Sequence, residues 1–194
     1  MKFGDGIDWD NEARRAEAAT AGAYATEALR AGASDLVSRL LDLKAGKRLI
    51  DCGCNIASYY PPLQGAGFDY VGVDQSAEAL NIARKRYPGI ELVHSYLWDM
   101  NFVAKPFDIA ISMAVLQHNQ LLEKRSILRA VAQAVRPAGY FAMQESTVLK
   151  ETATQLRQAQ WIELVEGHGF KLVDTWHPNP EYAVNDAYLF ERLP

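Results

Sequence analysis

The feature that most constrains the fold is a pair of short apolar segments, each ending in an aspartate, with a turn of small residues after the first. Residues 47–51 end in Asp51, the turn occupies residues 52–57, and residues 70–74 end in Asp74. A strand, a tight turn, a helix and a second strand tipped by an acid form the nucleoside-binding unit of α/β sheets. The second acid follows the turn by about 20 residues, the spacing expected for a ribose ligand. The pattern therefore predicts a nucleoside pocket in which Asp74 binds the ribose hydroxyls.

The first acid indicates which kind of nucleoside binds. Asp51 stands directly before the turn, where a dinucleotide would place its pyrophosphate. A carboxylate at this point repels phosphate and attracts an ammonium group. S-Adenosyl-L-methionine carries a ribose, an adenine and a cationic amino-acid end without any phosphate, so the two acids favour it over NAD or ATP. We expect Asp51 to bind the methionine amine directly or through water, and the product to be S-adenosyl-L-homocysteine.

The turn resembles the first motif of the class I S-adenosylmethionine-dependent methyltransferases, D-x-G-x-G-x-G, in the small single-domain members of types 11 and 12. Residues 51–57 read D-C-G-C-N-I-A, so that Gly53 is kept while Asn55 and Ala57 replace the other two glycines. Asn tolerates left-handed backbone angles better than most residues, and Ala is nearly as small as Gly. We therefore expect the turn to keep its shape, with Gly53, Cys54 and Asn55 beside the cofactor.

Further motifs extend the resemblance from Lys47 over nearly all of the remaining chain. They are F-D-I-A-I-S, V-L-Q-H, R-P-A-G-Y and G-H-G-F, at residues 107–112, 115–118, 136–140 and 167–170. Each motif is weak alone, but their order and spacing match the family. The resemblance implies an α/β fold with a Rossmann-like, seven-stranded, mostly parallel sheet, helices on both faces and a C-terminal antiparallel hairpin.

Hydrophobic periodicity and turn residues place the expected elements. Strands are expected at residues 48–51, 70–74, 90–94, 107–112, 140–144, 170–176 and 187–192. Helices are expected within residues 11–43, with a break at 32–34, and at 61–67, 76–87, 121–135 and 152–168. We expect one methyltransferase domain over residues 1–194, with an N-terminal helical cap at 1–46 and a core at 47–194.

Composition limits the partners and the compartment. The net charge of −4 gives no general attraction for nucleic acid. No spacing of Cys and His suggests a metal site, and no apolar run approaches the roughly 20 residues of a membrane span. Because no signal peptide is visible, we expect a cytoplasmic protein. The oligomeric state stays open.

The expected acceptor is a small molecule that takes the methyl group on an O or N atom. The N-P-P-Y-like segments of the enzymes that methylate amino groups of DNA and RNA are absent. The chain also lacks a long insertion after the fifth strand, so little sequence is available there for an acceptor cap. A methyltransferase acting on RNA or protein remains an alternative.

The resemblance also implies further cofactor-binding positions. Gln75 follows the ribose acid and is expected at the adenine edge, and Met113 directly follows the expected fourth strand and is expected beside the cofactor. Tyr96 and Leu97 take the adenine-contacting places after the third strand. A different register would bring in Asp99 instead, and the sequence does not choose between the two.

His118 and Glu145 are the candidate catalytic residues. His118 follows the fourth strand, where the methyl group should emerge, and imidazole suits deprotonation of a hydroxyl or amine; in the family this His commonly supports the loop instead. Glu145 ends the fifth strand at the same rim and either contacts the acceptor or is an exposed acid. Ahead of the core, Trp9, Arg14 and Tyr24 belong to a helix that folds over the cofactor or packs on the sheet edge.

Two other classes of function fit parts of the pattern. A nicotinamide dehydrogenase would need G-x-G-x-x-G after the first strand, and Asn55 and Asp51 argue against it. A non-catalytic cofactor-binding or partner subunit on the same fold is harder to exclude, because the first motif has lost two glycines. Binding of S-adenosylmethionine separates these classes.

Overall fold

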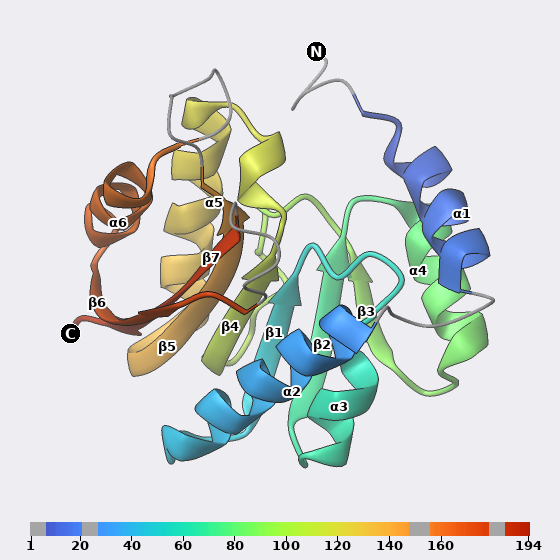
Figure 1. Ribbon diagram of the computed structural model, residues 1–194, viewed down its shortest axis with the longest axis horizontal. Helices are drawn as coiled ribbons and strands as arrows, with labels where there is room; N and C mark the ends of the chain where they lie inside the picture. Colours follow the sequence, from blue (N-terminus) through green and yellow to red (C-terminus); the bar gives the residue numbers. More distant parts are fainter. Residues whose placement is uncertain (1–6, 21–26, 148–155, 179–184) are drawn as a thin grey trace.

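The computed structural model describes residues 7–20, 27–147, 156–178 and 185–194. Within these ranges seven strands form one sheet in the order β3-β2-β1-β4-β5-β7-β6 (Figure 1). They are β1 (Arg48–Cys52), β2 (Asp69–Asp74), β3 (Glu91–His94), β4 (Phe107–Met113), β5 (Val135–Ser146), β6 (Phe170–Trp176) and β7 (Asn185–Arg192). Strands β1 to β5 pair in parallel, and β7 runs antiparallel to both β5 and β6. The predicted fold class is thereby confirmed.

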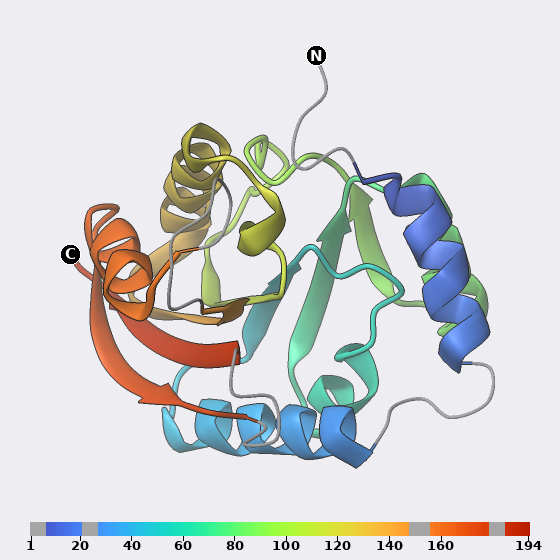
Figure 2. The same ribbon diagram turned by 45° about the horizontal axis from the view of Figure 1, so that its top comes forward.

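Helices cover both faces of the sheet (Figures 1 and 2). One face carries α2 (Glu27–Asp42), α3 (Tyr60–Gly65) and α4 (Ala77–Arg86), and the other carries α5 (Leu121–Ala134) and α6 (Gln158–Glu166). Successive strand residues point to opposite faces, so Leu49 packs under the first group of helices and Ile50 under the second. The helix α1 (Trp9–Thr20) packs on α4 through a separate small cluster that contains Ala13 and Ile82.

The N-terminal helices do not break where the sequence predicts. Helix α2 runs through residues 32–34, because one glycine inside a helix costs only about 1 kcal/mol and Leu36 and Leu40 bury their side chains in the core. An ion pair between Arg39 and Asp35, one turn apart, adds to the helix. Helices α1 and α2 are instead separated by residues 21–26, which lie outside the described residues.

Two later boundaries also differ from the prediction. Strand β5 begins at Val135, so residues 136–139, which lie between the expected helix and the expected strand, are part of the strand. A register shift lets Val135 pair with Phe107. Helix α6 begins at Gln158, because Leu156 forms a bridge to Thr147 before the helix starts. The predicted segment at 152–155 lies outside the described residues. These differences affect the far end of β5 and the start of α6.

The predicted start of α4 is confirmed, and it positions the site. Ser76 is the N-cap, and its Oγ accepts a hydrogen bond from the backbone N–H of Ala79 at 3.0 Å. The chain therefore turns sharply from the end of β2 into α4. Because β2 and β4 lie on opposite sides of β1, the connections after β1 and β4 diverge and leave a crevice at their carboxyl ends.

Candidate functional site

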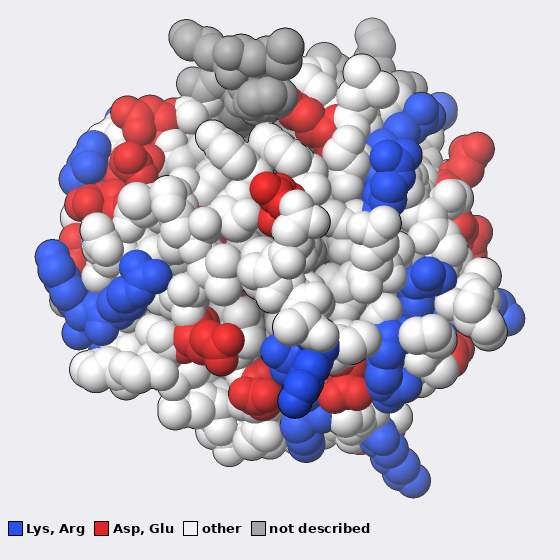
Figure 3. Space-filling model, turned by 180° about the vertical axis from the view of Figure 1, so that it is seen from behind, with Lys and Arg blue, Asp and Glu red and all other residues white. Residues whose placement is uncertain are grey.

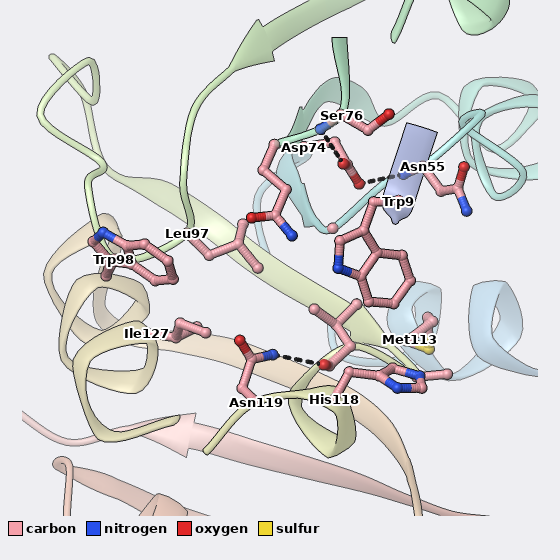
Figure 4. A pocket seen from close by; sticks show the side chains of 14 residues that line it. Trp9, Asn55, Asp74, Ser76, Leu97, Trp98, Met113, His118, Asn119 and Ile127 are labelled. Carbon is pink, nitrogen blue, oxygen red and sulfur yellow. Dashed lines mark hydrogen bonds between the residues drawn. The ribbon is translucent and has the colours of Figure 1, made fainter. Parts of the chain in front are cut away.

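A cavity of about 250 Å³ opens at the carboxyl ends of β1, β2 and β4 (Figure 4). Its position is the point where the strand order reverses, the usual ligand site of open α/β sheets. The lining residues are Trp9, Gly53, Asn55, Asp74, Gln75, Ser76, Leu97, Trp98, Met113, Ala114, Val115, His118, Asn119 and Ile127. Seven of the predicted site residues therefore meet in one cavity, namely Gly53, Asn55, Asp74, Gln75, Leu97, Met113 and His118.

The turn after β1 keeps a left-handed backbone at all three motif positions. The φ angle is 82° at Gly53, 48° at Asn55 and 57° at Ala57. The backbone N–H groups of Gly53 and Cys54 both donate to the carbonyl of Val73, at 2.8 and 3.0 Å, which ties the turn to β2. The expectation that the turn keeps its shape without two of its glycines is confirmed.

The carboxylate of Asp74 is fixed by two backbone groups at the cavity wall. Its Oδ2 accepts from the N–H of Asn55 and its Oδ1 from the N–H of Ser76, both at 2.8 Å (Figure 4). Burial raises the pKa of Asp74, and the same hydrogen bonds oppose that rise. A carboxylate offers about four acceptor positions, so these contacts leave acceptor capacity for a ligand hydroxyl group.

Asn55 carries an unsatisfied polar atom at the edge of this turn. Its side-chain Oδ1 is buried and has no hydrogen-bond partner among the described residues. In Figure 4 the side chain extends from the turn away from Leu97 and Trp98. Asn55 therefore costs stability through both its left-handed backbone and its buried oxygen.

Replacement of Asn55 by Gly should consequently raise the free energy of unfolding by about 1 kcal/mol. Relief of the left-handed strain and of the buried oxygen exceeds the entropy that glycine loses on folding. Denaturant unfolding measures this change, and titration with S-adenosylhomocysteine should show equal or tighter binding. The control is Ala57→Gly, which relieves the same backbone strain but removes a buried methyl group and should gain little. Binding weakened more than about tenfold by Asn55→Gly would mean that its amide contacts the ligand.

Leu97 and Trp98 form the cavity wall after β3. The exposed ring of Tyr96 stacks on Trp98 with centroids 4.7 Å apart and lies outside the lining. Asp99 is exposed and accepts a hydrogen bond from Asn101 at 2.5 Å. The structure therefore puts Leu97 in the predicted place, supports Tyr96 only as a backing for Trp98, and keeps Asp99 outside the lining.

Trp9 covers the cavity from the N-terminal helix. Its ring meets that of His118 edge-on, with centroids 5.2 Å apart and planes at 75° (Figure 4). The neighbouring Asp10 anchors the helix, because its Oδ1 accepts from the hydroxyl of Ser76 at 2.5 Å. At Trp9 the helix therefore folds over the site, one of the two placements that the sequence left open, while Ala13 of the same helix packs on α4.

Of the other N-terminal candidates, Arg14 is not among the lining residues. The guanidinium of Arg14 lies 3.8 Å from the carboxylate of Glu78 on α4. Tyr24 lies outside the described residues.

Asp51 and Cys54 are buried behind the cavity lining. The Tyr70 hydroxyl donates to Oδ2 of Asp51 at 2.7 Å, and burial raises the pKa of Asp51 to about 7 in spite of this bond. Cys54 fills space beside Gly72, where a Cβ atom would lie 2.8 Å from its sulfur. Burial raises the pKa of the Cys54 thiol. A role of either residue in cofactor binding stays a prediction. From its buried position Asp51 would act on the methionine amine through its charge.

Glu145 is not an exposed acid at the rim. It is fully buried, and its carboxylate accepts the backbone N–H groups of Val115, Leu116 and Gln117 at 3.3, 3.0 and 2.9 Å. Burial raises the pKa of Glu145 to about 7, against these hydrogen bonds and the charge of Lys124. Glu145 thus holds the loop that follows β4, and its contact with an acceptor stays a prediction without support from the lining.

Seven lining residues lie outside the predicted cofactor-binding and catalytic positions, although Trp9 was expected on a helix that either folds over the cofactor or packs on the sheet edge. They are Trp9, Ser76, Trp98, Ala114, Val115, Asn119 and Ile127. Ala114 has a φ of 59°, and no local sequence pattern predicts this angle. Ile127 lines the cavity from α5, a contact that depends on how the helix packs in the fold. Among the described residues no three His, Cys, Asp or Glu side chains gather as a metal site would require.

Comparisons with known proteins agree with this architecture. A family model described as a methyltransferase domain matches residues 24–175, most of the chain. The ubiquinone biosynthesis O-methyltransferase of Aromatoleum aromaticum is 33% identical over 100 residues, which cover 49% of this chain and 42% of that protein. The chain thus spans less than half the length of this curated relative.

Two solved structures share the fold. A TehB-like SAM-dependent methyltransferase from Corynebacterium glutamicum superposes with a TM-score of 0.75 at 17% identity, over 95% of this chain and 97% of its own. The 1,6-didemethyltoxoflavin-N1-methyltransferase of Burkholderia thailandensis gives a TM-score of 0.70 at 18% identity, over 87% and 79%. With its sheet order and its left-handed turn in place, the chain belongs to the methyltransferase-domain family and has the class I S-adenosylmethionine-dependent methyltransferase fold.

Proposed function

We propose that this protein transfers a methyl group from S-adenosylmethionine to a small-molecule acceptor. The observation that carries the proposal is the carboxylate of Asp74, fixed by two backbone N–H groups with acceptor positions left over at the cavity wall. The sulfonium of the bound cofactor supplies an electrophilic methyl carbon. The protein would bind the acceptor, orient it toward this carbon and exclude water from the site.

The residues present fit this cofactor. Asp74 would hold the ribose, Gln75, Leu97 and Trp98 the adenine, and Gly53 and Met113 the methionine part. Gly53 provides the close approach, because a Cβ atom there would lie 2.5 Å from the Val115 side chain. No lysine or arginine is among the lining residues, so the described cavity offers no cation for a pyrophosphate.

A planar ring compound is the acceptor that best suits the remaining wall. Trp9, His118 and Val115 present aromatic and apolar surface there. The names of the relatives agree, since one is a ubiquinone biosynthesis O-methyltransferase and another carries bound 1,6-didemethyltoxoflavin. On the face seen in Figure 3, basic and acidic side chains alternate around the edge rather than forming one basic surface, which favours a small acceptor over RNA.

The remaining organisation is also proposed. Residues 1–194 would act as one domain, with a cap at 1–46 over a core at 47–194, which the position of Trp9 supports. Across the described residues, no helix is long and apolar enough to pass through a bilayer. A cytoplasmic location stays a prediction.

Calorimetric titration with three ligands tests the proposed function. S-Adenosylmethionine and S-adenosylhomocysteine should bind, and NAD should not. Failure of the folded protein to bind either sulfur ligand at millimolar concentration would leave a non-catalytic partner subunit as the better reading. Tight binding of NAD alone would favour a dehydrogenase.

The affinity for S-adenosylmethionine should depend on pH through Asp51. Its pKa is about 7 because of burial. An ammonium group is attracted to the ionised carboxylate and not to the neutral acid, so below about pH 7 binding must release a proton. The dissociation constant should rise by up to about tenfold per unit as the pH falls below 7 and stay level just above it.

The variant Tyr70→Phe sharpens this test. It removes the hydrogen bond that lowers the pKa of Asp51, so the break in the affinity profile should move to higher pH. The control is Tyr60→Phe, which removes the hydroxyl from a ring 5.1 Å from that of Tyr70 and should leave the break in place. If the dependence of affinity on pH is the same in Tyr70→Phe as in the wild type, Asp51 does not contribute to cofactor binding.

A further inference from the structure

The loop that follows β4 is held at both ends by buried charged groups. Glu145 accepts the N–H groups of residues 115–117 at its start. At its end, the Nζ of the buried Lys124 donates to the carbonyl of Asn119. Burial lowers the pKa of Lys124 to about 8, while the charge of Glu145 opposes this. The loop that carries His118 is therefore clamped in one conformation.

Within this clamped loop the side-chain amide of Gln117 has only one possible orientation. Its Oε1 accepts the backbone N–H of Ser146 at 2.5 Å. A backbone N–H is always a donor, so the atom that faces it must be the carbonyl oxygen of the amide. The NH₂ group of Gln117 consequently points the other way, and its Nε2 lies 3.2 Å from Nε2 of His118.

We propose that Gln117 is a positioning residue that fixes the tautomer of His118, with the proton on Nδ1. An amide nitrogen has donors and no acceptor, so the Nε2 of His118 must be the accepting nitrogen of this contact. A neutral imidazole carries one N–H and one lone pair. Since the lone pair is on Nε2, the proton is on Nδ1.

This tautomer changes the role of His118 in methyl transfer. That consequence rests on the function proposed above. The lone pair of His118 is engaged inside the loop, and the imidazole ring forms an aromatic wall opposite Trp9. To act as a general base it would first have to break its contact with Gln117. In the proposed site His118 is therefore an aromatic wall held in place by Gln117, and its predicted role as a base requires this contact to open.

Nuclear magnetic resonance of ¹⁵N-histidine-labelled protein reads this tautomer directly. The chain has four histidines, and His118→Gln identifies the His118 signals by their loss. At about pH 8.5, where ordinary imidazoles are neutral, two-bond ¹H–¹⁵N correlations should show His118 protonated on Nδ1. In Gln117→Glu one carboxylate oxygen still accepts from Ser146 and the other faces the ring, so Nε2 should become protonated.

The control is Gln64→Glu, the same change at an exposed position on α3, which should leave the His118 signals unchanged. A wild-type His118 protonated on Nε2 would overturn the inference, whether or not Gln117→Glu folds. An unaltered tautomer in a folded Gln117→Glu would overturn it as well. Titration of the same samples with S-adenosylhomocysteine tests the methyltransferase proposal separately, because the tautomer does not require a ligand.

Discussion

Asp74→Ala should weaken binding of S-adenosylhomocysteine at least about 30-fold. The carboxylate would lose two charged hydrogen bonds to the ribose, each worth about 1.5–3 kcal/mol. The same variant also removes the acceptor for the backbone N–H groups of Asn55 and Ser76, so the free energy of unfolding should fall by about 1–3 kcal/mol. Calorimetry and denaturant unfolding measure the two effects.

Asp69→Ala is the matched control, because Asp69 is an exposed acid at the other end of the same strand. Its loss should leave ligand affinity unchanged and cost little stability, since its ion pair with Arg48 is long, at 3.9 Å, and exposed. A folded Asp74→Ala that binds S-adenosylhomocysteine as tightly as the wild type would remove Asp74 from the cofactor site.

Gly53→Ala should lower the free energy of unfolding by more than about 2 kcal/mol and abolish measurable cofactor binding. A left-handed backbone costs a non-glycine residue about 1–2 kcal/mol. In addition, the new Cβ would lie 2.5 Å from Cγ2 of Val115, so the cavity wall at Met113–Val115 must move. Denaturant unfolding and titration with S-adenosylhomocysteine measure the two losses.

Gly67→Ala separates the strain from the collision. Gly67 has nearly the same φ, +81° against +82°, and a Cβ atom there would meet nothing within 4 Å. This variant should show the backbone cost alone, with unchanged ligand affinity. Equal losses of stability in the two variants would mean that Val115 yields without cost.

The sequence predicted the fold well because its signals are local. Apolar runs ending in polar residues gave the strands to within a few residues, and Ser76 was recognised as the cap of α4 from its position after a strand. The place of Asp74 at the cavity wall was predicted for the same reason, since it depends on a strand, a turn and a fixed spacing. The predicted break at residues 32–34 was wrong, because the burial of Leu36 and Leu40 outweighs the cost of a glycine inside α2.

The parts of the site that the sequence missed or left open depend on contacts between distant segments. Trp9 reaches the cavity because Asp10 bonds to Ser76, a residue 66 positions away. Glu145 appeared to be a rim acid, because its position at the end of β5 does not disclose that three N–H groups of residues 115–117 converge on it. The engagement of His118 by Gln117 likewise follows from the pairing of this loop with Ser146.

The turn after β1 shows that a loop can hold left-handed backbone angles at motif positions where glycine is replaced by other residues. Asn55 and Ala57 hold the left-handed angles usually assigned to glycine. Each such residue costs up to about 1–2 kcal/mol, against a typical total stability of about 5–15 kcal/mol. The loss of a motif glycine is therefore a matter of degree, tolerated for as long as the rest of the sheet is stable enough to hold the backbone in place. Searches that require the glycines themselves would miss such proteins, whereas the backbone angles would find them.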